Sequence, residues 1–151
     1  MESSPETAAR RAELERAAPL APRGLWRKAE WNGRSAVFLC GTVGAAFDAW
    51  QRKLAATSAA DAYFAQQIGL DAVEREMDRL ENEVKVKVEG EGRKLLPRKS
   101  PGYGDLPLEL SRTIVERLDA TRRIGVAVTE SNLLVPSKSV TAICEMEEAK
   151  P

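Results

Sequence analysis

Few side chains in this 151-residue chain are suited to chemistry, and it contains no histidine. The clearest cluster is a block of four cations with no acid among them, Arg93, Lys94, Arg98 and Lys99. Such a block suits contact with phosphate, either of a lipid headgroup or of nucleic acid. Its four charges are fewer than the usual polybasic patch carries, and a solvated loop is the favoured interpretation.

No catalytic constellation accompanies these cations. The chain has no histidine to act as a general base, no GxSxG elbow, no Walker loop and no GxGxxG motif. Cys40 lies in an apolar run, which raises the pKa of a thiol and quenches it, and Cys144 has no basic neighbour. The sequence therefore predicts a protein that is not an enzyme, with no cofactor and no metal site.

The most distinctive segment is an uncharged apolar run from Ser35 to Phe47, with Trp31 before it and Trp50 after it. Aromatic side chains at both ends of an apolar helix are typical of a membrane span. The 13 uncharged residues are fewer than the roughly 20 that a span needs, so a buried helix remains the alternative. The run is interpreted as a short single-pass helix at 34–53.

Small residues lie on one side of this expected helix. Gly41, Gly44 and Ala45 would allow a neighbouring helix to approach closely. Together with Trp31 and Trp50, they are the residues expected to pack against the membrane or a partner helix.

A second pattern follows, in which Leu70, Val73, Met77, Leu80 and Val84 repeat in steps of three and four. These residues form a heptad seam, as in a coiled coil. Only about two heptads are sustained, so pairing with the chain's own helix at 108–118 is favoured over a partner chain. Binding of a partner protein through the seam stays open.

The remaining regions follow from proline, glycine and charge patterns. The expected architecture is mainly α-helical, with a short single-pass or buried apolar helix, a long amphipathic helix, a second helix and a small β element. The regions are an N-terminal helical arm and linker at 1–33, the apolar helix at 34–53, the amphipathic helix with the seam at 54–92, a Pro/Gly-rich basic loop at 93–107, a helix plus small β element at 108–144, and an acidic tail at 145–151.

A chain with a membrane helix, no active site and little core of its own is typical of an accessory subunit. The expected function is therefore to brace or assemble a larger membrane complex, with other subunits and membrane lipid as partners and no nucleic-acid partner. The expected location is a membrane, with the mitochondrial inner membrane as the candidate, and the chain lacks the pattern of a secreted protein. The alternative is a soluble helical scaffold or adaptor that binds another protein through the seam.

Overall fold

The apolar run at 35–47 is a β-strand that leads into a helix, and this changes the whole architecture. The computed structural model describes residues 4–148, which are 50% helical and 25% strand and form an α+β fold. The elements, in order, are α1 (Pro5–Ala17), β1 (Arg23–Trp31), β2 (Arg34–Thr42), α2 (Ala45–Thr57), α3 (Ala59–Gly90), β3 (Arg93–Leu95), α4 (Leu110–Leu118), α5 (Ala120–Ile124), β4 (Ala127–Val128), β5 (Leu134–Val135) and β6 (Ser139–Glu148).

A tight hairpin joins the first two strands. Asn32 and Gly33 form its two-residue turn, with φ values of 52° and 75°, and Trp31 pairs with Arg34 directly before it. An Asn-Gly pair favours this turn because both central residues need positive φ. The expected arm and linker at 1–33 therefore contain an edge strand, β1.

Four antiparallel strands make up the main sheet, in the order β1-β2-β6-β3. The longest strand, β6, pairs with β2 so that Val37 lies opposite Cys144 and Thr42 opposite Ser139. Glu145 to Glu148 belong to β6, so the first part of the expected acidic tail is sheet. Residues 149–151 lie outside the described residues.

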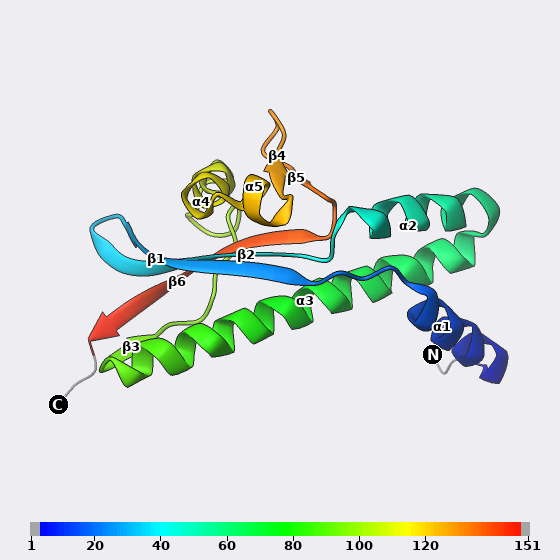
Figure 1. Ribbon diagram of the computed structural model, residues 1–151, viewed down its shortest axis with the longest axis horizontal. Coiled ribbons are helices and arrows are strands. Elements are labelled where there is room, and N and C mark those ends of the chain that lie inside the picture. Colours follow the sequence, from blue (N-terminus) through cyan, green and yellow to red (C-terminus); the bar gives the residue numbers. More distant parts are fainter. Residues whose placement is uncertain (1–3, 149–151) are drawn as a thin grey trace.

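Helices cover both faces of this sheet. The long helix α3 crosses one face, while α4 and α5 lie on the other, as Figure 1 shows. Ala36, Phe38 and Cys40 of β2 pack toward α4 and α5, and the alternate residues Val37 and Leu39 pack toward α3. A strand buried on both faces reads as a continuous apolar run, which periodicity alone does not separate from a buried helix.

The expectation of a mainly helical chain with a membrane-spanning helix is therefore wrong. Among residues 4–148, no helix is both long and apolar enough to cross a bilayer. The membrane-subunit function and the membrane location both depended on that helix and are overturned with it, and the expected contact with membrane lipid is not supported. Of the two expected functions, the adaptor without a membrane helix agrees better with the structure.

The residues expected at the membrane have other roles. Trp31 ends β1 and packs on the cluster beneath α4, and Trp50 lies in α2 against Phe47, with 5.4 Å between ring centroids. A Cβ atom on Gly41 would lie 2.7 Å from the Sδ atom of Met77 in α3. The small residue in β2 thus permits close packing of α3 on the sheet.

Two more of these residues lie where β2 passes into α2. Gly44 adopts a φ of 90° as the N-cap of α2, and exposed Ala45 begins that helix.

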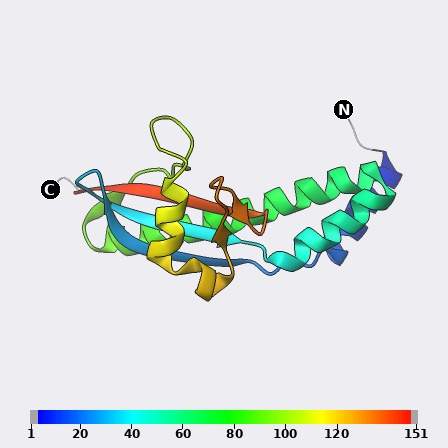
Figure 2. The ribbon, with the colours of Figure 1, turned by 90° about the horizontal axis from the view of Figure 1, so that it is seen from above.

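The helix α3 runs for 32 residues and is capped by Ser58, whose hydroxyl oxygen accepts a hydrogen bond from the backbone N–H of Asp61. Its first part extends past the sheet and carries α1 and α2, which Figure 2 shows from above. Leu14 of α1, Phe47 of α2 and Ile68 of α3 belong to a third apolar cluster at this end.

Candidate functional site

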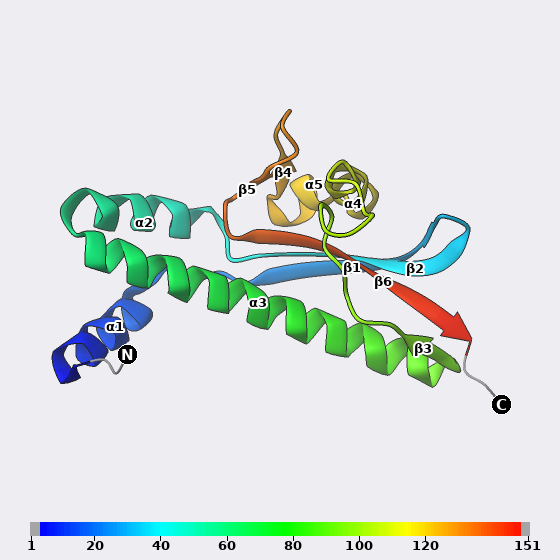
Figure 3. The same cartoon turned by 180° about the vertical axis from the view of Figure 1, so that it is seen from behind.

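A groove with a volume of about 520 Å³ opens beside α4, which is within the usual range for small-molecule sites. Its walls come from α3, the segment between β3 and α4, α4 itself, the β4–β5 turn and the start of β6. The segment between β3 and α4 passes from the α3 side of the sheet to the α4 side, as Figure 3 shows from behind. The groove therefore forms where five separate parts of the chain meet.

Hydroxyl groups line the floor of the groove. The Oγ atom of Ser111 lies 3.0 Å from Oγ1 of Thr141, and both residues are buried. Two residues earlier on β6, the hydroxyl of Ser139 lies 2.8 Å from that of Thr42. Ser139 and Thr141 share one face of the strand because side chains alternate along it. The floor is thus a fixed row of polar groups that can each still accept a hydrogen bond.

Apolar side chains and one aromatic ring form the rim. Tyr103 is 75% exposed, Leu133 is 62% exposed and Leu108 is 43% exposed, and all three line the groove. Exposed apolar side chains that gather around a cavity are typical of a binding surface.

Backbone hydrogen bonds hold Tyr103 in this position. Lys99 and Ile143 exchange two of them, at 2.8 and 2.9 Å, which ties the segment to β6. Gly102 then turns with a φ of 91°, and its N–H donates to the carbonyl of Leu106 at 3.0 Å. Because Leu106 is buried, this short loop is anchored on both sides of the exposed tyrosine.

A second hollow of about 470 Å³ adjoins the groove and shares Ser100 and Tyr103 with it. Arg98 and Asp105 also line this hollow. The side chain of Arg98 is 20% exposed, because three carboxylates of α3 surround its guanidinium group.

Most cations of the basic block form ion pairs with acidic side chains. Arg93 pairs with Glu148 at 3.1 Å, and Lys99 pairs with Glu145 at 3.2 Å, while Arg98 binds the acids of α3. Lys94 is exposed and makes no ion pair within residues 4–148. Three of the four cations that were candidates for phosphate contact are thus already paired with acids within the fold.

The seam residues face inward. Val73 is buried in the cluster with α1 and α2, while Met77, Leu80 and Val84 are buried against the sheet. Leu70 is 41% exposed. The chain's own fold therefore uses this seam, and Leu70 is the one seam residue that is exposed to solvent.

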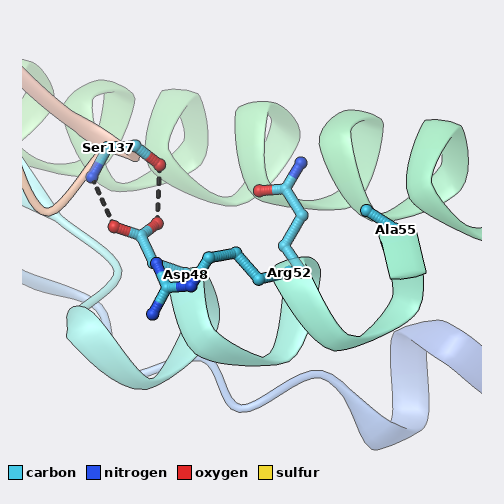
Figure 4. A pocket seen from close by; sticks show the side chains of 5 residues that line it. Asp48, Arg52, Ala55 and Ser137 are labelled. Carbon is cyan, nitrogen blue, oxygen red and sulfur yellow. Dashed lines mark hydrogen bonds between the residues drawn. The ribbon is translucent and has the colours of Figure 1, made fainter.

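A smaller pocket of about 210 Å³ lies at the end of the groove and shares Ser137 with it. Figure 4 shows Asp48 of α2 pointing at Ser137, whose backbone N–H and hydroxyl both donate to the carboxylate. Arg52 lines the same pocket and makes no ion pair within the described part of the chain. The contact between Asp48 and Ser137 holds the segment before β6 against α2.

Lys138 follows Ser137 and is buried at 6% exposure. Its Nζ atom donates to the side-chain oxygen of Gln51 at 3.2 Å and to the hydroxyl of Ser137 at 3.3 Å. It lies 5.9 Å from the centre of the Phe47 ring. Burial lowers the pKa of Lys138, and the charge of Asp48 opposes that shift. We interpret the lysine as part of the packing between α2 and β6.

Neither thiol is suited to nucleophilic chemistry. Cys40 and Cys144 lie in the two clusters on opposite faces of the sheet, and burial raises the pKa of each to about 12. Among residues 4–148, no three His, Cys, Asp or Glu side chains gather in a way that could hold a metal ion.

Comparison with known proteins gives a fold and no family. No family model matches the chain, and no curated protein matches it either. Among solved structures, the fold is similar to a MetH reactivation domain bound to AdoHcy, with a TM-score of 0.66 and 16% identity. The match covers 97% of this chain and 65% of that one, so the chain spans about two thirds of the neighbour's length. The chain is therefore an α+β protein whose fold is similar to part of that domain.

Proposed function

We propose that the chain binds an S-adenosyl thioether, the class of ligand to which AdoHcy belongs, in the groove beside α4. The observation that carries the proposal is this groove, with its exposed tyrosine and its floor of hydroxyls, in a fold whose solved neighbour was crystallised with AdoHcy.

The groove residues suit the parts of such a ligand. A purine ring stacks well on an exposed aromatic side chain, and Tyr103 offers one. The ribose hydroxyls need polar partners, which Ser100, Ser111 and Thr141 can supply. Glu74 lines the same groove, and its Oε1 atom, which Arg98 does not bind, can accept a hydrogen bond from the ammonium group of the amino-acid part.

We propose a binding role without catalysis for this site. Serine and threonine hydroxyls line the groove, but a hydroxyl nucleophile needs an adjacent base to be activated. The carboxylate of Glu74 is already engaged by Arg98 at 2.8 Å.

A protein partner is the second part of the proposal. Leu108, Leu133 and Val135 are between 43% and 62% exposed and lie around the groove or next to it. Such a rim favours contact with another protein, so a ligand in the groove would lie at the interface. The chain would then present its ligand to the partner, which agrees with an adaptor role.

Titration of the full-length chain with AdoHcy, by calorimetry and by amide NMR shifts, tests the ligand. We expect saturable binding, with shifts at Ser100, Tyr103 and Leu133 and none in α1. Adenosine and homocysteine, titrated separately, should each bind more weakly than the whole molecule. Absence of binding at millimolar AdoHcy, or shifts confined to other surfaces, would overturn the proposal.

A further inference from the structure

Three acidic residues of α3 converge on one arginine next to the groove. Glu74, Asp78 and Glu81 lie four and three positions apart, which places them on one face of the helix. Nη1 of Arg98 donates to Asp78 and to Glu81, and Nη2 donates to Glu74, each at 2.8 Å. We call these four residues the arginine clamp.

The clamp is stronger than separate surface ion pairs. Single exposed pairs contribute little, but a network around a mostly buried guanidinium contributes more. Carboxylates spaced four apart on a helix also repel each other when no cation lies between them, as for Glu74 and Asp78. Arg98 relieves that repulsion, so the acids of α3 favour the position of the segment that carries it.

The clamp lies directly before the groove loop. Arg98 is two residues before Ser100 and five before Tyr103, and these two residues line both hollows. At this point Lys99 also anchors the segment to β6, through its backbone pairing with Ile143 and through the ion pair of its side chain with Glu145. One anchor holds the segment to the sheet, and the clamp holds it to α3.

We infer that Asp78 and Glu81 are positioning residues for the groove, acting through Arg98 on the placement of Ser100 and Tyr103. They touch no part of the groove themselves, whereas Glu74 lines it. This inference rests on the proposed function, because its effect is measured as the affinity for the adenosyl ligand.

The test is the double variant Asp78→Asn/Glu81→Gln in the full-length chain. It removes two of the three charge partners and leaves Glu74 in the groove. We expect the Kd for AdoHcy to rise about tenfold, which is about 1.4 kcal/mol. In the absence of ligand, the amide shifts of Ser100, Gly102 and Tyr103 should also move.

Asp71→Asn is the matched control. Asp71 lies on the same helix, one turn before Glu74, and pairs with Arg11 of α1. It does not line the groove, so its loss should leave both the Kd and the loop shifts unchanged. The single variant Asp78→Glu, which keeps a carboxylate at this position and leaves Glu81 unchanged, should retain the native Kd. A general loss of stability in the double variant would not explain that difference.

Each outcome has one meaning. A Kd within twofold of the native value in the double variant, with unmoved loop shifts, overturns the inference. If circular dichroism shows that the double variant is unfolded, the Kd and the loop shifts are measured for Asp78→Asn alone. If the native chain binds no AdoHcy, the proposed function fails, and the ligand-free shifts still show whether the clamp positions the loop.

Discussion

Both carboxylate oxygens of Asp48 bind Ser137, one accepting the backbone N–H at 2.8 Å and the other accepting the hydroxyl at 2.6 Å. These residues are 89 positions apart in the sequence. The pair fastens α2 to the segment that enters β6, and therefore to one end of the groove.

Replacing this carboxylate tests how much the pair contributes. Asp48→Ala removes two hydrogen bonds to a charged acceptor, and we expect the free energy of unfolding to fall by about 1.5 to 3 kcal/mol. Chemical denaturation measures the change. Arg52→Ala, one turn later on the same helix, should change it by less than about 0.5 kcal/mol. Equal effects of the two substitutions would contradict this account.

Gly41 tests the packing of α3 on the sheet. A Cβ atom there would lie 2.7 Å from the Sδ atom of Met77, so Gly41→Leu requires the buried Met77 side chain, or α3 itself, to move away. We expect a loss of more than about 3 kcal/mol, at the upper end for overpacked cores. Gly90→Ala is the control, because a Cβ atom at Gly90 meets nothing within 4 Å. Thermal melts of both variants would show the difference, and a native melting temperature for Gly41→Leu would exclude this packing.

Tyr103 tests the groove in its own right. Stacking of a base on an aromatic ring contributes about 1 to 3 kcal/mol, so Tyr103→Ala should weaken AdoHcy binding by about tenfold or more. The melting temperature should stay near the native value, because the side chain is 75% exposed. Tyr63→Ala is the matched control, since Tyr63 is 63% exposed and lies on α3 away from the groove. Calorimetric titrations of both variants decide the matter, and equal loss in both would argue against stacking at Tyr103.

The two buried thiols should make the free energy of unfolding depend on pH in the alkaline range. Burial raises the pKa of Cys40 and Cys144 from 9.0 to about 12, so between these values the folded chain keeps protons that the unfolded chain has released. Stability from these groups is therefore complete below about pH 9 and is lost as the pH rises toward 12. The double variant Cys40→Ala/Cys144→Ala should show a shallower decline in unfolding free energy. A decline as steep as that of the native chain would contradict the assignment.

Reaction of the native chain with a thiol reagent at pH 8 gives an independent check. We expect neither thiol to react until the chain is unfolded, because both are fully buried.

The sequence alone was enough to predict local structure, but it was not enough to predict the sheet. The 3-4 spacing from Val73 to Val84 does mark a buried helix face, because this pattern depends on near neighbours in the sequence. The strand β2 was misread because its two faces are covered by elements far away in the sequence, α3 and α4. The Asn32-Gly33 pair was the available signal for a hairpin. As evidence for a strand, it outweighs the length of the apolar run that follows, which had suggested a helix.

The groove was harder to predict for a related reason. Ser111 and Thr141 meet only because α4 packs on β6, and no spacing in the sequence brings them together. Tyr103 lies in the turn-rich segment between Gly102 and Gly104, and an exposed aromatic residue in such a loop was the one local sign of the site. The basic block was visible in the sequence, but its acidic partners on α3 and β6 were not assignable without the fold.

The length of α3 has a consequence for how the molecule opens. Its 32 residues extend about 48 Å, whereas the nine-residue strands beside it extend about 30 Å. The first turns therefore lie beyond the sheet, where α1 and α2 cover them. Segments with fewer buried neighbours open at lower free energy than a doubly covered sheet. In hydrogen–deuterium exchange, amides near Ala59 should lose protection well before those of β2, so the molecule would open from that end while the groove stays closed.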